Sequence, residues 1–366
     1  MTNHNATNER IKRTYFVFLK EAFGHSEETI DEVAKALSRF EEHSKWRDFA
    51  RFHREQAIAF KRHLAETPSQ ITGELLSKAT SYKTASHLKR FFHWLASQPG
   101  FRSRLQHTDA NYFNLSDKDT RIACARRESI TPSLEEINRV LASMPCQTDI
   151  ERRDRALVAF TILTGARDGA IASMKLKHVN VSEDLVNQDA REVRTKFSKT
   201  FPTAFFPVGD QARDILVAWI GFLRQGLLWG DDDPLFPATN VVLGEKRLYE
   251  QSGLRREHWS TAAPIRRIFR TAFEAAGLTY FHPHSFRRTL ALLAGRICRS
   301  PEQFKAWSQN LGHESVLTTW SSYGTVDEQR QKEILREMAA RGSEDIDEGQ
   351  RVLRDFAMYL RTRRLE

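Results

Sequence analysis

Apolar residues recur at helical spacing through most of the first hundred residues of the chain. Three segments follow this pattern: residues 29–43, 49–66 and 82–97. In the third segment, four apolar residues fall on one face of the expected helix: Leu88, Phe91, Phe92 and Leu95. Amphipathic helices must bury their apolar faces against one another. The sequence therefore predicts a helical first domain over residues 1–103.

The helical pattern fades after Gly100 and returns near Thr131. Residues 104–130 combine turn-forming residues with mixed charge, which predicts an interdomain linker. A length of 366 residues allows two or three domains. We expect a second domain over residues 131–341 and a C-terminal helical tail over residues 342–366.

The second domain is expected to be mainly helical with a small β-sheet. The segment TPSLEEINRVLASM predicts a helix capped by Thr131 or Ser133, and ERRDRALVAFTILTGAR predicts a buried helix that ends near Gly165. Residues 179–209 carry strand-forming residues broken by polar turns. The remaining expectations are helices over residues 210–228, a loop over residues 229–264 and helices from there to the end.

The positive charge of the chain is concentrated after residue 50. The formal net charge is +9, from 56 Lys and Arg against 47 Asp and Glu. Residues 1–50 hold eight basic and nine acidic residues, whereas residues 51–110 hold ten basic and four acidic residues. A basic surface of this kind favours a polyanionic partner, most commonly nucleic acid.

Cysteine usage and hydropathy predict a soluble protein of the cytoplasm. The three cysteines, Cys124, Cys146 and Cys298, are far apart and form no CxxC motif, which is typical of a reducing compartment. The first residues contain no apolar signal core, and no apolar run approaches the length of a membrane span. We therefore expect no membrane partner.

Motifs for several common enzyme classes are absent. The sequence contains no GxxxxGK[ST], GxGxxG, HExxH or GxSxG motif and no Cys/His set at zinc spacing. A scattered set of cationic and polar residues remains in the second domain, in the contexts TGARDGAIASMKL, FSKTFPTAFFP, HPHSFRRTLA, LGHESVLTTW and SSYGTV. In chain order these residues are Arg167, Lys199, His284, Arg287, His313 and Tyr323.

This ordered set resembles that of the tyrosine recombinase, or phage integrase, family, whose pattern runs Arg, Lys, His-x-x-Arg, His or Trp, and Tyr. The resemblance implies a helical core-binding domain and an α+β catalytic domain that close as a C-shaped clamp around DNA. It also implies a site-specific recombinase or integrase, of a bacterial mobile element, that works without metal or nucleotide. The implied partners are double-stranded DNA, further copies of the chain as a tetramer on paired sites (a dimer or monomer when free), and DNA-bending accessory proteins. Its compartment would be the cytoplasm, with the protein associated with the nucleoid.

The resemblance also assigns a role to each residue of the set. Tyr323 would attack the scissile phosphodiester and form a 3′-phosphotyrosyl link, with His284 as its general base. Arg167 and Arg287 would neutralise the charge that develops on the phosphate, because guanidinium groups present donors that match phosphate oxygens. Lys199 would protonate the departing 5′-oxygen, and His313 would contact the phosphate or support the site.

Two of these assignments require a choice of register. In HPHSFRRTL, His284 and Arg287 match the family's Pro-His-x-x-Arg box, and residues at i and i+3 share one face of a helix. His282 and Arg288 are then flanking groups. Lys199 has the spacing expected before Pro207 in the β segment, and Lys196 remains the alternative.

The sequence departs from the family pattern at two places. The family usually carries an acidic residue three positions after its first arginine, where this chain has Ala170, although Asp168 is close by. The spacing from His313 to Tyr323 is one residue longer than the commonest spacing. These departures bear on the rate or folding of the protein and on the register of the nucleophile.

Basic residues of the first domain, and Arg288, are candidates for contacts with DNA phosphates. The candidates are Lys78, Lys83, Lys89, Arg90 and Arg288. Two rival functions stay open at this point: a non-catalytic DNA-binding protein of the same fold, and a related topoisomerase or telomere resolvase.

Overall fold

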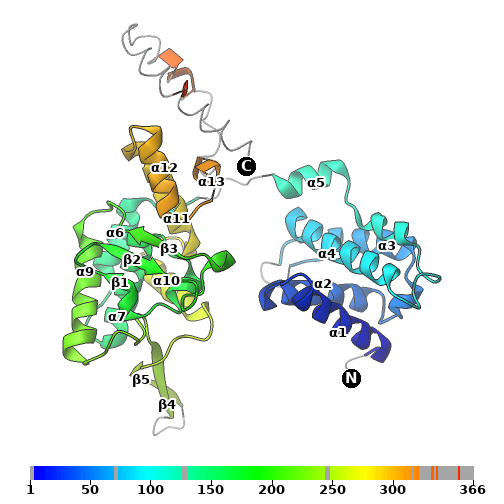
Figure 1. Cartoon of the computed structure of the whole chain (residues 1–366), viewed down its shortest axis with the longest axis horizontal. Helices are drawn as coiled ribbons and strands as arrows, with labels where there is room; N and C mark the ends of the chain where they lie inside the picture. The colour runs from blue at the N-terminus through cyan, green and yellow to red at the C-terminus, as the bar shows by residue number, and fades with distance from the viewer. Residues whose placement is uncertain are drawn as a thin grey trace. The chain divides into compact units, whose positions relative to one another are not determined.

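The computed structural model describes residues 4–69, 73–125, 130–243, 248–314 and 316–320, together with the short pieces 331–333, 335–336 and 353–354. The chain divides into two compact units, Met1–Arg127 and Glu128–Glu366. Both units are drawn in Figure 1 and are described separately below.

The first unit is helical. Its elements are α1 (Ala6–Glu21), α2 (Glu27–His43), the 3₁₀ turn η1 (Phe49–Arg51), α3 (Arg54–Glu66), α4 (Lys78–Ser97), the 3₁₀ turn η2 (His107–Phe113) and α5 (Asp117–Cys124). The apolar face predicted on α4 is confirmed, because Leu88, Phe91, Phe92 and Leu95 are at most 1% exposed. Aromatic rings fill much of this core: the rings of Phe52 and Phe92 stack with centroids 3.8 Å apart.

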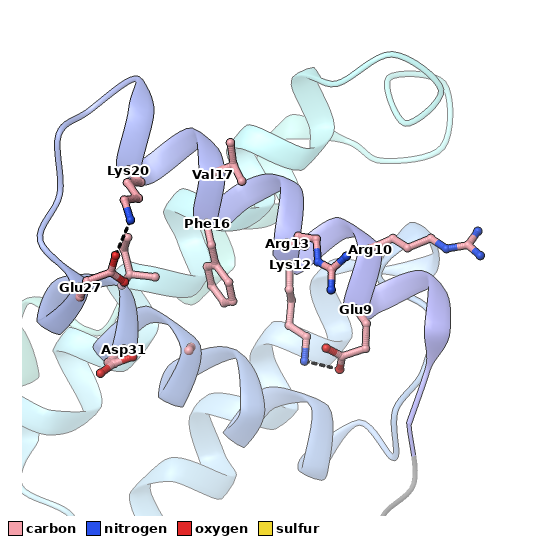
Figure 2. Close-up of a pocket in the computed structure, with 11 residues that line it drawn as sticks. Glu9, Arg10, Lys12, Arg13, Phe16, Val17, Lys20, Glu27 and Asp31 are labelled. Carbon is pink, nitrogen blue, oxygen red and sulfur yellow. Dashed lines mark hydrogen bonds and ion pairs between the residues drawn. The ribbon is translucent and has the colours of Figure 1, made fainter.

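Helices α1 and α2 line a groove of about 600 Å³ (Figure 2), and a polar network that includes Glu9 and Lys12 of the groove ties the two helices together. The Lys12 ammonium contacts Glu9 and Glu41 at 2.6 Å each. Glu41 also accepts a hydrogen bond from the fully buried Asn8 amide at 3.1 Å. A buried carboxylate needs such partners, so this network fixes how the two helices pack.

The segment predicted as a linker contributes to the core of the first unit along its first ten residues. Leu105, Ala110 and Phe113 are buried there. The ring centroid of Phe113 lies 5.5 Å from that of Phe52 and 5.8 Å from that of Phe40. The expectation of a linker beginning at residue 104 was therefore wrong for this stretch, because three apolar residues within ten are too few to produce a recognisable period.

Among its described residues, the second unit is mainly helical and contains two small antiparallel sheets. Its helices are α6 (Leu134–Ser143), α7 (Asp149–Thr164), α8 (Asp168–Ile171), α9 (Asp210–Gly221), α10 (Ala263–Ala275), α11 (His284–Ile297), α12 (Pro301–Asn310) and α13 (Val316–Trp320). Short turns join them: η3 (Leu176–His178), η4 (Lys196–Ser198) and the π-turn η5 (Phe222–Gly226). Helix α7 is almost completely buried from Ala156 onward and ends at Gly165, as predicted.

Helix α6 begins at the predicted cap. Ser133 accepts a hydrogen bond from the Glu136 backbone N–H at 3.1 Å, and the Glu136 carboxylate accepts one from the Ser133 N–H at 2.7 Å. Ser133, rather than Thr131, is therefore the capping residue, in a reciprocal capping box.

The predicted β segment forms a three-stranded sheet. Strand β1 (Val179–Asn180) pairs with β2 (Leu185–Gln188), which pairs with β3 (Phe201–Ala204) in the register Leu185↔Ala204. The side-chain amide of Asn310, the last residue of α12, bonds both the N–H and the carbonyl of Ala204, at 2.7 and 2.8 Å. The sheet is thus tied to the end of α12.

A β-hairpin lies where a loop was expected. Within residues 229–264, β4 (Ala238–Leu243) pairs with β5 (Tyr249–Arg255), and the hairpin protrudes from the unit in Figure 1. Its outer residues are exposed on both faces, so the sequence lacks the apolar alternation of a half-buried strand. The prediction of a loop was wrong for this reason.

We predict that Phe113→Ala lowers the free energy of unfolding of the first unit by about 3–5 kcal/mol, the usual cost of removing a buried phenyl ring. Ile122 on α5 is 44% exposed, so Ile122→Ala should change stability little. Hydrogen exchange of the α3 and α4 amides in the whole protein measures the local effect. Equal protection in both variants would contradict the placement of Phe113 in this core.

Candidate active site

The guanidinium of Arg287 is the buried centre of the candidate site. Arg287 lies on the first turn of α11, is 5% exposed, and donates hydrogen bonds to the carbonyls of Gly165 and Leu311. Its third partner is His313, whose Nε2 lies 3.1 Å from Nη2 of Arg287. Two segments that are distant in sequence, the end of α7 and the turn after α12, therefore meet on one side chain.

Two glycines make this meeting sterically feasible. Gly165 ends α7 in the left-handed region, and a Cβ there would lie 3.0 Å from methyl groups of Leu290 and Leu311. Gly312 also has a positive φ of 67°, and a Cβ there would lie 2.6 Å from the Phe201 ring. Because only glycine adopts this conformation without strain, the motifs TGAR and LGH need their glycines for backbone reasons.

The hydrogen bonds of His313 define its tautomer. A guanidinium only donates, so Nε2 of His313 accepts from Arg287 and Nδ1 carries the proton. Nδ1 then donates to Thr319 Oγ1 at 2.7 Å, and Thr319 donates to Ser308 Oγ at 2.8 Å. Burial, together with the charges of Arg287, Arg167 and His284, lowers the pKa of His313 to about 4.

Arg167 and His284 complete the cationic cluster. Arg167 directly precedes α8 and is half-buried, and desolvation lowers its pKa. His284 is the first residue of α11 and reaches the surface; its pKa is lowered by partial desolvation, then by Arg287 and Arg167. In the part of the chain that the structure describes, no carboxylate forms an ion pair with Arg167 or Arg287.

Burial without a carboxylate has a clear electrostatic consequence. Desolvation and the neighbouring charge of Arg167 lower the pKa of Arg287 to about 9. A partly buried cation with no counter-charge is costly in free energy, and a bound anion relieves that cost. The cluster is therefore suited to bind an oxyanion such as a phosphodiester.

Lys199 reaches the same region from the loop that precedes β3. It follows η4 and precedes β3, and its ammonium forms an ion pair with Glu314, the residue after His313. Phe197 and Ser198, the two residues before it, have positive φ values of 61° and 50°. Such conformations are strained for non-glycine residues and concentrate at functional sites. The alternative, Lys196, instead places its ammonium 4.9 Å from the centre of the exposed Phe197 ring.

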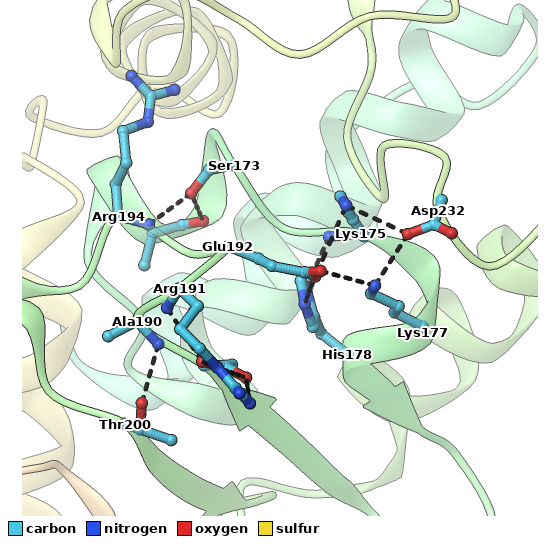
Figure 3. A network of polar contacts seen from close by, with 12 residues as sticks. Ser173, Lys175, Lys177, His178, Ala190, Arg191, Glu192, Arg194, Thr200 and Asp232 are labelled. Carbon is cyan, nitrogen blue, oxygen red and sulfur yellow. Dashed lines mark hydrogen bonds and ion pairs between the residues drawn. The ribbon is translucent and has the colours of Figure 1, made fainter.

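A polar network holds the loop that carries Lys199 (Figure 3). The Ala190 N–H donates to Thr200 Oγ1 at 3.0 Å, which closes the loop next to Lys199. The Arg194 guanidinium donates to the carbonyls of Trp259 and Ser260 at 2.7 and 2.9 Å. At the base of the loop, Glu192 contacts Lys177 at 2.8 Å and His178 at 3.0 Å.

The two flanking residues of the HxxR box differ in their surroundings. His282 is exposed, and its Nδ1 accepts a hydrogen bond from the His284 N–H at 3.2 Å, so it caps the start of α11. Arg288 is half-buried on the same helix. The capping role of His282 follows from local backbone geometry, which the motif alone does not reveal.

The acidic residue next to Arg167 makes a contact with a distant residue that no local motif indicates. Asp168 pairs with Arg266 of α10, at 2.9 Å to both Nε and Nη2. Ala170, at the position where the family carries its acid, is 1% exposed within the apolar core.

Tyr323 lies outside the described residues. Of the helices expected beyond it, only the short pieces 331–333, 335–336 and 353–354 are described, and these are helical. Among the described residues, no group of three or more His, Cys, Asp or Glu side chains is placed to hold a metal ion. None of the helices in the described part of the chain is both long and apolar enough to cross a membrane.

The basic residues suggested as DNA contacts lie mostly on α4. Lys78 and Lys83 pair with Asp119 and Glu32 at 2.8 and 2.6 Å. Lys89 donates to the Asn114 side chain at 2.9 Å, while Arg90 is exposed. These side chains lie at or near the surface of the first unit, where ion pairs contribute little to stability.

Comparison with known structures supports the fold. A lambda integrase fragment, solved as a dimer bound to a COC′ core site, matches with a TM-score of 0.59 and 14% identity, over 87% of this chain and 98% of that one. The XerH site-specific recombinase bound to difH substrate matches with a TM-score of 0.54 and 18% identity, over 84% of this chain and 78% of that one.

Comparison with known sequences extends over much of the chain. Tyrosine recombinase XerC of Pseudomonas putida is 24% identical over 206 residues, which are 56% of this chain and 59% of that protein. Tyrosine recombinase XerC of Lactobacillus delbrueckii subsp. bulgaricus is 22% identical over 253 residues, or 68% of this chain and 72% of that protein. The model of the phage integrase family matches residues 133–330, which include every residue of the cluster around Arg287. The chain is therefore a member of the phage integrase family of tyrosine recombinases.

Proposed function

We propose that the protein is a site-specific DNA recombinase that cuts and rejoins duplex DNA through a 3′-phosphotyrosyl intermediate at Tyr323. The observation that carries the proposal is the buried Arg287, which has Arg167, His284 and His313 around it and no carboxylate partner among the described residues. The family membership of residues 133–330 supplies the reaction class.

The proposed reaction accounts for every proton that moves and for every bond that forms or breaks. His284 takes the proton of the Tyr323 hydroxyl, and the tyrosyl oxygen attacks phosphorus. The bond from phosphorus to the 5′-oxygen breaks, and that oxygen takes a proton from Lys199. Religation reverses these transfers with a new 5′-hydroxyl, so the phosphotyrosyl link conserves the bond energy and neither metal nor nucleotide is required.

The two arginines would stabilise the transition state. Negative charge develops on the non-bridging oxygens of the phosphate, where Arg167 and Arg287 provide donors that are already oriented. His313 is neutral at pH 7, because its pKa is lowered to about 4, and its hydrogen bond to Arg287 holds the guanidinium in place. We assign His313 to this supporting role.

The wider assembly follows from the same proposal. The two units would close around duplex DNA, with Lys78, Lys83, Lys89, Arg90 and Arg288 as phosphate contacts. Lambda integrase has been solved as a tetramer bound to a Holliday junction, with a TM-score of 0.58 to this chain. We propose a tetramer on paired sites of a bacterial mobile element, with DNA-bending proteins as accessory partners and the cytoplasmic nucleoid as its location.

Inorganic sulfate should bind the arginine cluster and raise the pKa of His313 from about 4, because a nearby anion stabilises the imidazolium. Titration of the His313 ring signals by NMR measures the effect. Arg167→Gln should reduce the response at the same sulfate concentration. A His313 titration that sulfate leaves unchanged would contradict the anion site.

The nucleophile is tested by covalent trapping. The protein is incubated with DNA that flanks its own gene and is then denatured with detergent. We expect a protein–DNA adduct with the wild type and none with Tyr323→Phe, because only the hydroxyl can form the phosphoester. An adduct that survives the substitution would assign the attack to another residue.

The general acid is tested with a modified substrate. Lys199→Ala should cleave ordinary DNA poorly but should recover on a duplex with sulfur in place of the scissile 5′-oxygen. A thiol has a pKa of about 8.5 and leaves without protonation. Lys196→Ala is the matched control and should cleave both substrates like the wild type. The opposite result would assign the general acid to Lys196. In that case Lys196→Ala would cleave only the sulfur substrate well, and Lys199→Ala would cleave both substrates like the wild type.

A further inference from the structure

The ion pair between Asp168 and Arg266 lies directly beside the proposed active site. Asp168 is the first residue of α8 and follows Arg167 in the chain. Its Oδ2 contacts both Nε and Nη2 of Arg266 at 2.9 Å, and its Oδ1 accepts from the Gly169 N–H at 3.0 Å. The Asp168 side chain is 21% exposed and that of Arg266 is 52% exposed. The carboxylate is thus held in one orientation at the edge of the site.

The same face of α10 reaches the segment that leads into α11. Arg270 lies one turn after Arg266, and its guanidinium carbon lies 4.7 Å from the centre of the Tyr280 ring. His282, two residues after Tyr280, accepts a hydrogen bond from the backbone N–H of His284 at the start of α11. Asp168 is therefore placed near the start of the helix that presents His284.

The charges that act on His284 and His282 agree with this placement. Desolvation is the largest cause that lowers the pKa of His284, and Arg287, Arg167 and His282 lower it further. Asp168 is the negative charge that opposes them. At His282, desolvation again lowers the pKa, Asp168 opposes it and Arg266 adds to it. Asp168 and Arg266 thus act on this segment with opposite sign.

The position three residues after Arg167 cannot supply such a charge. Ala170 is 1% exposed and packs within the apolar core of the second unit. A carboxylate there would be buried among apolar side chains, at a considerable cost in free energy. Asp168 is only partly buried and already has partners in Arg266 and the Gly169 N–H, so it is the acid that this fold can accommodate.

We propose that the Asp168–Arg266 pair is a positioning element for His284. Asp168 stabilises the imidazolium that forms when His284 takes the proton of Tyr323, and Arg266 orients the carboxylate and limits its field. This inference rests on the proposed function, in which His284 is the general base. The effect of the Asp168–Arg266 pair on the pKa of His284 can nonetheless be measured in the protein without DNA.

The titration of His284 in the full-length protein, followed by NMR and assigned with His284→Gln, tests the pair directly. Asp168→Asn removes the negative charge and keeps the shape, so the pKa of His284 should fall. Arg266→Gln removes the charge that opposes Asp168, so the pKa of His284 should rise. The double variant should resemble Asp168→Asn alone, because the carboxylate is the source of the effect.

A matched control lies elsewhere in the second unit. Arg213 pairs with Asp184 at 2.8 Å, and neither charge acts on His282 or His284, whereas Asp168 acts on both and Arg266 acts on His282. Arg213→Gln should therefore leave the His284 titration at its wild-type value. Shifts in the same direction for Asp168→Asn and Arg266→Gln, or no shift for Asp168→Asn, would overturn the proposal and leave the pair as a structural contact.

The cleavage reaction provides the second readout. His284 acts as a base only when neutral, so the rate of adduct formation should rise with pH through its pKa. Asp168→Asn should shift this rise in rate to lower pH. It should also lower the maximal rate at high pH by roughly tenfold, because His284 is then a weaker base. Arg266→Gln should shift the rise to higher pH. If the wild type forms no adduct, the proposed function fails, whereas the NMR titration still decides whether the pair acts on His284.

Discussion

The packing of the second unit depends on a buried guanidinium, that of Arg287, which has no carboxylate partner in the described part of the chain. Arg287 satisfies its hydrogen bonds with two carbonyls and one imidazole, and these neutral acceptors do not cancel its charge. The end of α7, the start of α11 and the turn after α12 must all meet for these bonds to form. The positions of Gly165 and Gly312 follow from that requirement, as does the neutral state of His313.

The same arrangement underlies the proposed action of the site on a phosphodiester. Arg167 adds a second positive charge, which lowers the pKa of Arg287 and of both histidines. A bound anion stabilises the charged form of each of these groups. Binding of a phosphate would therefore also compensate the buried positive charge. The Asp168–Arg266 pair lies beside this cluster and would act on His284 without pairing with Arg167 or Arg287.

The residues of the cluster were predictable from sequence because their motifs are local. His284 and Arg287 are three residues apart on one helix, and the glycines of TGAR and LGH mark the turns that bring Arg167 and His313 to them. The amphipathic helices of the first unit were predictable for the same reason, since their apolar stripes recur over several turns.

Other features depend on contacts between distant residues. The pairing of Asp168 with Arg266 spans 98 positions. The β4–β5 hairpin has exposed residues on both faces, so its sequence shows no alternation of apolar and polar residues. Phe113 is buried in the core although its segment shows no repeated apolar spacing. The choice of Lys199 over Lys196 depends on the backbone at Phe197 and Ser198, whose left-handed conformation has no signature in the sequence.

The most direct measurement is the identity of the residue bonded to DNA. The trapped adduct would be digested with protease and nuclease, and the linked peptide would be sequenced by mass spectrometry. The account predicts a peptide in which Tyr323 carries the 3′-phosphate of a nucleotide. A different residue, or a link to a 5′-phosphate, would contradict it.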